Sequence, residues 1–234
     1  MYSLYMTKFL IISDGHGDVE KLRAVKKAAE ASDAVIFAGD FAAFQKPETG
    51  MPFLTELLKL HTHIFAVLGN CDPQEFEAEL KKAEISITNS LKKFNGFHFI
   101  GSGGGSKFTG TTPYERTDEE LVSDLADVQQ KAKNEKDGKI KNLILVCHNP
   151  PHGVKTDKVA PLVHVGSKGI RQFIERYRPI LTVSGHIHEA FAIDKIGETV
   201  LINPGALMDG RYATAEISDD GEHIKAELHC LPEK

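Results

Sequence analysis

Residues 9–18, Phe-Leu-Ile-Ile-Ser-Asp-Gly-His-Gly-Asp, decide how the rest of the chain is interpreted. A short apolar run leads to Asp14, and His16 follows two positions later. Such a run, ending in acidic and glycine residues, is typical of a strand buried on both faces. Because ligands of open α/β sheets collect beyond the carboxyl ends of the strands, both side chains are candidates for binding. Taken alone, the stretch fits an ordinary strand-to-helix turn equally well.

The same pattern recurs along the chain, and this repetition favours a shared site. Each further apolar run ends in a polar side chain that can bind a metal ion or phosphate. The endings are Asp40, Asn70, His148, the pair His186 and His188, and Asn203. Independent turns would not be expected to supply so many metal-binding groups in the same strand context.

Length and charge restrict the class of protein. A chain of 234 residues fits one large α/β domain, and we expect a single domain over residues 1–234. The formal net charge of −5 argues against a general nucleic-acid-binding surface, although a nucleotide can still be a substrate. No apolar run approaches the roughly 18 to 20 residues of a membrane span, and we identify no signal peptide.

The three cysteines indicate a reducing compartment. Cys71, Cys147 and Cys230 cannot all pair within one chain, and Cys147 lies in an apolar run. We therefore expect free thiols and a cytoplasmic location.

The order of the expected elements favours an α/β fold with two facing sheets and helices outside them. In the first part of the chain, apolar runs alternate with helical patterns. These cover residues 19–30 and 52–60 and segments that begin at Pro73, at the capping box of Thr117 and Glu120, and at Ser167. Asn95-Gly96 is a hairpin signal. The last strands, at 190–196, 199–203, 211–217 and 223–231, follow one another directly.

Two loops lie beside the expected site. Residues 101–107 are rich in glycine, but Ser106 precedes Lys107 and so excludes a nucleoside-triphosphate-binding loop. We interpret this stretch as a flexible bend. Residues 149–166 form a long connection of the kind that often contacts substrate. Lys107 and Arg116 are candidates for contact with a substrate phosphate.

The donor atoms suit a pair of transition-metal ions. Asp, Asn and His side chains favour Mn, Fe, Zn, Co or Ni over ions that need thiolates. The seven donors other than Asn203 are too many for one tetrahedral ion and about right for two. Two ions roughly 3.5–4 Å apart need a bridging carboxylate, and a water bound to them, with its pKa lowered to about 7, supplies a hydroxide nucleophile.

The ordered motifs resemble those of the calcineurin-like metallophosphoesterases. They are Asp14-Gly-His16, Gly39-Asp40, Gly69-Asn70, His148 and Gly185-His-Ile-His188, and the likeness covers residues 9–206. Within this family the chain is most similar to small prokaryotic phosphodiesterases of the YfcE and archaeal type. The resemblance implies an α/β fold that is a four-layer αββα sandwich, with two mixed β-sheets flanked by helices.

The resemblance also implies a role for each matching residue. Asp14, His16 and His188 would hold one ion. Asn70, His148 and His186 would hold the other, and Asp40 would bridge the two. Asn203 would support the site without binding metal.

The catalytic assignments are Asn70, Cys71, Asp72, His148 and His152. Many family members have His directly after the Asn, where it assists the phosphate and the leaving group, whereas this chain has Cys71 and then Asp72. The thiol of Cys71 could donate a proton, or Cys71 could be a small packed residue. His152 is either a second proton donor or a surface histidine of its loop.

The implied function is hydrolysis of a phosphoester by a metal-bridging hydroxide, with a phosphodiester as the preferred substrate. Two divalent ions are expected, with Mn first and Fe, Zn, Ni or Co as alternatives. The expected partner is a small-molecule phosphoester or nucleotide, with no membrane, and a homodimer is compatible with the sequence. Two alternatives stay open: a phosphomonoesterase or protein phosphatase, and a non-catalytic interaction scaffold on the same fold.

Overall fold

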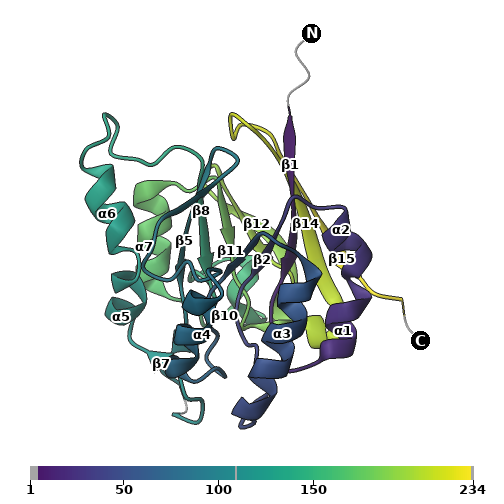
Figure 1. Cartoon of the computed structure of the whole chain (residues 1–234). Coiled ribbons are helices and arrows are strands. Elements are labelled where there is room, and N and C mark those ends of the chain that lie inside the picture. The colour runs from purple at the N-terminus through teal and green to yellow at the C-terminus, as the bar shows by residue number, and fades with distance from the viewer. Residues whose placement is uncertain (1–4, 109, 233–234) are drawn as a thin grey trace.

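Two facing β-sheets form the centre of the structure, and helices cover their outer faces (Figure 1). The structure is a computed structural model that describes residues 5–108 and 110–232. The first sheet has the strand order β15 (Ile224–Cys230), β14 (Arg211–Ser218), β1 (Met6–Ile12), β2 (Ala34–Phe37) and β3 (Ile64–Ala66). β1, β2 and β3 are parallel, as the alternation of strands and helices predicts, and β14 and β15 are antiparallel to their neighbours.

The second sheet is also mixed. Its strand order is β12 (Ala192–Ile196), β13 (Thr199–Asn203), β11 (Leu181–Val183), β8 (Leu143–Cys147), β5 (Phe97–Ser102) and β4 (Lys92–Phe94). The four inner strands are parallel, and the two edge strands are antiparallel to them. The hairpin between β4 and β5 turns at Asn95 and Gly96, both at positive φ, as the sequence predicts.

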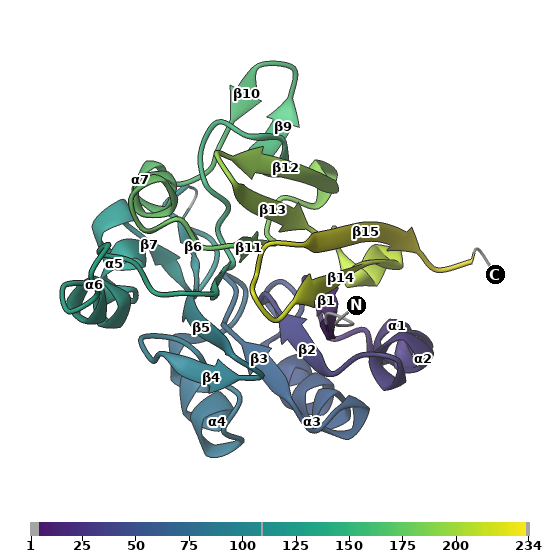
Figure 2. The same ribbon diagram turned by 90° about the horizontal axis from the view of Figure 1, so that it is seen from above.

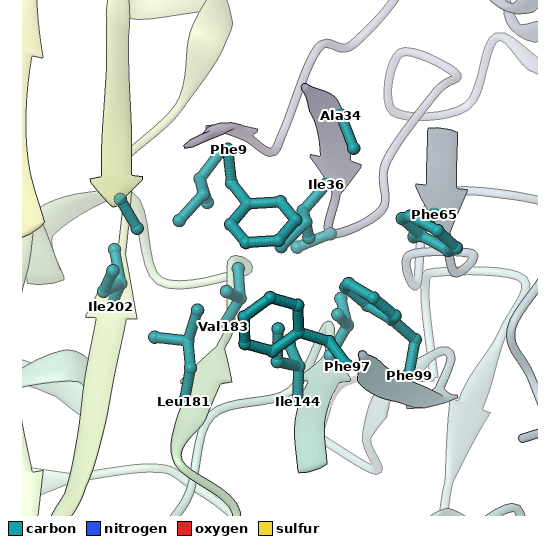
Figure 3. Close-up of a cluster of buried hydrophobic side chains, with 14 of the residues drawn as sticks. Phe9, Ala34, Ile36, Phe65, Phe97, Phe99, Ile144, Leu181, Val183 and Ile202 are labelled. Atoms are coloured by element: carbon teal, nitrogen blue, oxygen red, sulfur yellow. The ribbon is translucent and has the colours of Figure 1, made fainter. Parts of the chain in front are cut away.

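The main apolar core lies between the two sheets (Figure 3). Phe9 and Ile11 of β1 face this core, whereas Leu10 and Ile12 face the helices on the other side. Both faces of the strand are therefore buried, which explains why the run from Phe9 to Ile12 is apolar throughout. Across the gap, the ring of Phe65 stacks on that of Phe99 with centroids 3.9 Å apart.

Helices complete the four layers. The first sheet is covered by α1 (Val19–Ala24), α2 (Lys26–Glu30), α3 (Gly50–Leu60) and α4 (Glu77–Lys82). The second is covered by α5 (Asp118–Ser123), α6 (Ala126–Ala132) and α7 (Lys168–Tyr177). The predicted αββα sandwich is confirmed. Across the described part of the chain, no helix combines the length and apolar character that crossing a bilayer requires.

Two helices predicted as continuous are interrupted. The helix predicted over 19–30 breaks at Val25, whose N–H donates to the carbonyl of Leu22 and so makes a tighter turn than an α-helix. The helix after the capping box breaks in the same way at Leu125, whose N–H donates to Val122. Both Val25 and Leu125 are buried, so each break directs an apolar side chain into the core.

The 149–166 connection, predicted as a long loop that contacts substrate, contains a small hairpin of β9 (Lys158–Ala160) and β10 (Val163–His164). Buried Asp157 organises it. The carboxylate of Asp157 accepts hydrogen bonds from the N–H groups of Gly153 and Gly166, at 2.9 and 3.0 Å, and from His164 Nδ1 at 2.6 Å. A second small pair, β6 (Gly105–Ser106) with β7 (Glu115–Arg116), replaces the predicted flexible bend.

Candidate metal centre

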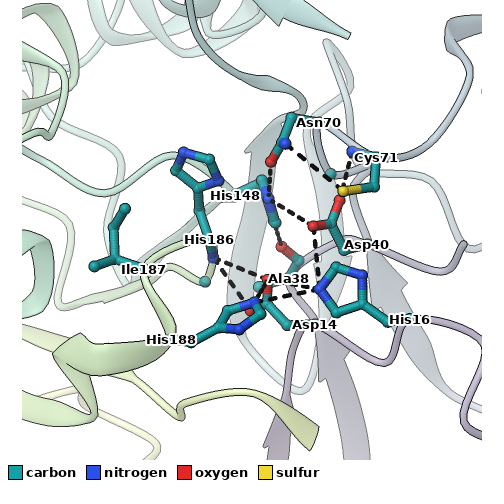
Figure 4. A network of polar contacts seen from close by, with 12 residues as sticks. Asp14, His16, Ala38, Asp40, Asn70, Cys71, His148, His186, Ile187 and His188 are labelled. Atoms are coloured by element: carbon teal, nitrogen blue, oxygen red, sulfur yellow. Dashed lines mark hydrogen bonds and ion pairs between the residues drawn. The ribbon is translucent and has the colours of Figure 1, made fainter. Parts of the chain in front are cut away.

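Polar residues that follow five strands gather at one end of the two sheets (Figure 4). The group consists of Asp14 and His16 after β1, Asp40 after β2, Asn70 after β3, His148 after β8, and His186 and His188 after β11. The first sheet supplies the carboxylates and the second sheet supplies three of the histidines. The site therefore depends on the packing of the two sheets against each other.

Several of these residues have strained backbones. Asp14, His16, Asp40 and His186 all have positive φ, at 53°, 45°, 61° and 68°. This left-handed conformation is uncommon for residues other than glycine, and such strain is concentrated at functional sites. The turns bring the side chains together beyond the strand ends.

Glycines allow the backbone to pack directly on the two carboxylates. A Cβ atom added at Gly69 would lie 1.9 Å from Asp40 Oδ1. One added at Gly185 would lie 1.9 Å from Ser13 Oγ and 2.6 Å from Asp14 Oδ2. Any side chain at either position would therefore displace a candidate ligand or its neighbour.

Asp14, His16 and His188 form one half of the cluster. Nε2 of His16 lies 3.2 Å from Nε2 of His188, which in turn lies 3.3 Å from Asp14 Oδ1. On its other side, His16 Nδ1 lies 3.2 Å from the carbonyl of Ala42. We assign the Nδ1 proton to this hydrogen bond, which leaves the lone pair of Nε2 directed at the cluster.

His148 and Asn70 form the other half. His148 Nδ1 lies 2.7 Å from the carbonyl of Ala38, so its proton is assigned there, and His148 Nε2 lies 2.9 Å from Asn70 Oδ1. In the neutral ring of His148, two acceptors then face each other with no proton between them. A cation would satisfy both, and the donor set fits a metal ion for this reason.

Asp40 lies between the two halves. Its Oδ2 is 3.6 Å from His16 Nε2 and also 3.6 Å from His148 Nε2. Its Oδ1 accepts a hydrogen bond of 2.8 Å from the N–H of Cys71, which fixes the orientation of the carboxylate. One oxygen is therefore placed as a carboxylate that bridges two ions requires.

The electrostatics favour an ionised carboxylate among the histidines. Burial alone would raise the pKa of Asp14, but a hydrogen bond from His188 and the charges of neighbouring histidines hold it well below its usual value. Burial and the neighbouring His148 lower the pKa of His186 to about 4. The hydrogen bond to Asp14 raises the pKa of His188 to about 9, so a bound cation would displace a proton there.

Not every candidate lies equally close to the others. Among the described residues, three sets of donor atoms lie within 4.8 Å of one another. The sets are Asp14 with His16 and His188, Asp14 with Asp40 and His148, and His16 with Asp40 and Cys71. His186 is placed beside His148, with ring centroids 5.2 Å apart. The sequence does not predict Cys71 as a metal ligand. Its one distinguishing feature in the sequence is that it stands where many family members have His.

Cys71 lies beside Asp40 within the cluster, and Asp72, the next residue in the chain, is buried behind it. Cys71 is buried, and burial together with the charge of Asp40 raises the pKa of its thiol, which supports the alternative of a small packed residue. Asp72 is fully buried, and its carboxylate accepts hydrogen bonds from the N–H groups of Gly69, Ala42 and Asp40 at 2.8, 2.8 and 3.1 Å. Burial, with Asp40 nearby, raises the pKa of Asp72 to about 7. These contacts point to support of the site loops by Asp72.

His152 and Arg116 contact other groups. His152 Nδ1 lies 3.7 Å from Asp157 Oδ2 in the 149–166 loop, and none of the three donor sets includes it. Arg116 forms a salt bridge with Asp124 and donates to the carbonyl of Gly103 at 2.9 Å, so its guanidinium is used within the protein. This contradicts its interpretation as a phosphate contact.

Asn203 supports the loop that carries His186 and His188, as the resemblance implies. Its Nδ2 donates to the carbonyl of Ile187 at 2.9 Å, and its Oδ1 accepts from the N–H of Gly205 at 2.9 Å. Asn203 is fully buried, so these bonds hold the loop against the core of the protein.

Known proteins share both the sequence pattern and the fold. The sequence profile of the calcineurin-like phosphoesterases matches residues 7–190. The uncharacterized protein MJ1162 of Methanocaldococcus jannaschii is 36% identical over 203 residues, which cover 84% of this chain and 87% of that protein.

Solved structures agree with the fold. TT1561 of Thermus thermophilus has a TM-score of 0.70 at 16% identity, covering 97% of this chain and 100% of that one. A dimetal phosphatase from Danio rerio has a TM-score of 0.62 at 10% identity, covering 97% and 99%. Calcineurin-like phosphoesterases are dinuclear metal-dependent hydrolases of phosphoric esters, and the described residues provide candidate ligands for such a centre. The profile match over most of the chain and the 36% identity to MJ1162 show that this chain belongs to the calcineurin-like phosphoesterase family.

Proposed function

We propose that the chain is a phosphodiesterase that uses two divalent metal ions bridged by Asp40. The observation that carries this proposal is the position of Asp40 Oδ2, 3.6 Å from a ring nitrogen in each half of the cluster. A carboxylate shared in this way suits two ions about 3.5–4 Å apart.

In this proposal the two halves of the cluster hold one ion each. Asp14, His16 and His188 hold the first, and Asn70, His148 and His186 hold the second, with Asp40 shared. When bound, the ions lower the pKa of a water to about 7 for use as nucleophile and neutralise charge on the phosphate. Nitrogen and oxygen donors support Mn²⁺ first, with Fe, Zn, Ni and Co as alternatives.

The protein's own part is to hold the ligands in place before substrate arrives. The carbonyl groups of Ala38 and Ala42 orient the rings of His148 and His16 through their Nδ1 atoms. Such contacts from outside the ligand set fix the tautomer, and their loss commonly weakens metal binding by about 10- to 100-fold. The Asp72 carboxylate holds the loops of Asp40 and Asn70 together through hydrogen bonds from the N–H groups of Asp40 and Gly69.

The preference for diesters rests on the resemblance to small prokaryotic phosphodiesterases that also have Cys after the Asn. We also propose a small-molecule phosphoester or nucleotide substrate and action as one domain, because both sheets share the core between them. The free thiols of Cys71, Cys147 and Cys230 support a cytoplasmic location.

Metal analysis and hydrolysis together test the proposal. We expect protein loaded with Mn²⁺ to hold two ions, by mass spectrometry, and to hydrolyse bis-4-nitrophenyl phosphate faster than 4-nitrophenyl phosphate. D40N should lose both ions, whereas C71A should keep them. Metal-loaded protein with no turnover of either ester would support an interaction scaffold instead, and faster monoester hydrolysis would support a phosphomonoesterase.

A further inference from the structure

A cavity of about 430 Å³ opens directly beside the candidate metal centre. Asn70 and His186 of the cluster form part of its wall, so a phosphoester held at the metals would extend into it. Ile187 adds to this wall, and the rest comes from residues 106–108, 112 and 115 around β6 and β7 and from Val159 and Val165 at the β9–β10 hairpin, which protrudes beside β12 (Figure 2). Neither segment supplies a candidate metal ligand.

The wall away from the metals is apolar. Phe108, Val159, Val165 and Ile187 contribute to it, and Phe108 is 90% exposed although it is a large aromatic residue. Exposed apolar side chains that gather around a cavity mark a binding surface more often than single ones do. Their position next to the metal centre indicates that the bound group belongs to the substrate.

The polar groups of the cavity are few, and its one carboxylate is already engaged. Glu115 accepts hydrogen bonds from the N–H groups of Phe108 and Gly110, at 2.8 and 2.9 Å, and from that of Thr112. The hydrogen bond from Phe108 is the largest cause that lowers the pKa of Glu115 to about 2. Glu115 therefore holds Phe108 at the cavity and is not placed to recognise a polar ligand.

Lys107 lines the cavity and is its one lysine or arginine among the described residues. A cation at the edge of an apolar cavity complements an anionic phosphate with a hydrocarbon substituent. A nucleoside would instead need hydrogen-bonding partners for its base, which this wall supplies poorly.

We propose that the cavity binds a hydrocarbon ester group of the substrate, which is then an alkyl phosphodiester. This inference rests on the proposed phosphodiesterase function and adds the class of substrate. Phosphate binds at the metals, and the alkyl group lies against Val159, Val165 and Ile187. Each methylene that leaves water completely should raise affinity by roughly fourfold.

Binding of symmetric diesters by isothermal titration calorimetry tests this proposal. The probes are dimethyl and dibutyl phosphate, added to the Mn²⁺-loaded protein. We expect dibutyl phosphate to bind at least tenfold more tightly, because three additional methylenes of one chain enter the cavity. A further gain with dihexyl phosphate would identify a lipid as the source of the alkyl group, and a plateau would identify a small soluble ester.

Two valines on the same hairpin provide matched variants. Val165 lines the cavity and is 37% exposed, whereas Val163 does not line it and is 46% exposed. V165S should reduce the preference for dibutyl phosphate to below threefold, and V163S should keep it. Because both positions are partly exposed, neither change should prevent folding.

The inference would be overturned if the two diesters bound equally well, or if V165S and V163S lost the preference for dibutyl phosphate to the same extent. Tighter binding of the methyl ester of thymidine 5′-phosphate than of dibutyl phosphate would also overturn it. So would a dimer in solution that V165S disrupts, because the apolar wall would then be a subunit interface. Hydrolysis of bis-4-nitrophenyl phosphate without an alkyl preference would refute the inference and leave the proposed function intact. An alkyl preference in binding without hydrolysis of any diester would refute the proposed function, and with it the substrate class, and would leave the cavity only as a binding site for alkyl groups.

Discussion

Replacement of Asp72 by Asn separates a structural role for this residue from a catalytic one. The Asp72 carboxylate accepts three backbone N–H groups while fully buried, two at Oδ2 and one at Oδ1. An Asn side chain can keep the two bonds at Oδ2, but its NH₂ group then faces the N–H of Ala42 with no acceptor between them. A buried donor left unpaired costs about 1–3 kcal/mol.

We therefore expect D72N to lower the free energy of unfolding by about 1–3 kcal/mol. D72A leaves all three N–H groups without their acceptor, so it should lower the free energy of unfolding by more than D72N does. Urea denaturation measures both, and D137N is a control, because exposed Asp137 also accepts a backbone N–H but from solvent-accessible Lys139. The control should change stability by less than about 0.5 kcal/mol.

Activity decides between the two roles. If Asp72 only holds the loops of Asp40 and Asn70, D72N should retain kcat for bis-4-nitrophenyl phosphate to within about tenfold while it loses stability. Unchanged stability with a loss of kcat above a hundredfold would refute this reasoning and restore the catalytic assignment.

Three further predictions concern packing, pH and metal removal. G185A should lower the free energy of unfolding by about 1–3 kcal/mol, because its Cβ would lie 1.9 Å from Ser13 Oγ. In G50A the new Cβ meets nothing closer than 3.4 Å, so urea denaturation of this control should show no change in stability. Burial would raise the pKa of Asp157, but His164 and backbone N–H groups hold it below its usual value. The ionised carboxylate therefore stabilises the fold above about pH 4, and this contribution is lost as the pH falls further. D157N should make the free energy of unfolding depend less on pH below about pH 4. Chelation of Mn²⁺ held at a hundred times Kd should lower stability by roughly 2.7 kcal/mol per site, and an unfolding midpoint unaffected by chelator would contradict a metal centre.

The strands and the convergence of their ends follow from the sequence because buried parallel strands produce apolar runs with polar endings. Phe9 to Ile12 is apolar throughout, since its residues alternate between the inter-sheet core and the helices. Capping chemistry is equally local, and Thr117 and Ser167 begin α5 and α7 as predicted.

Features that depend on distant partners could not be predicted in this way. The hairpin within 149–166 forms around the buried Asp157, which resembles any other loop acid in the sequence. The guanidinium of Arg116 is taken by Asp124, a pairing that no local pattern indicates. The position of Asp72 between the loops of Asp40 and Asn70 likewise depends on the packing of these two loops.

A crystal structure of the protein with Mn²⁺ and phosphate, with the ions located by anomalous scattering, is the decisive measurement. We expect two Mn²⁺ ions about 3.5–4 Å apart, with one oxygen of Asp40 bound to both. A single ion, or two ions that do not share Asp40, would contradict the proposed dinuclear centre.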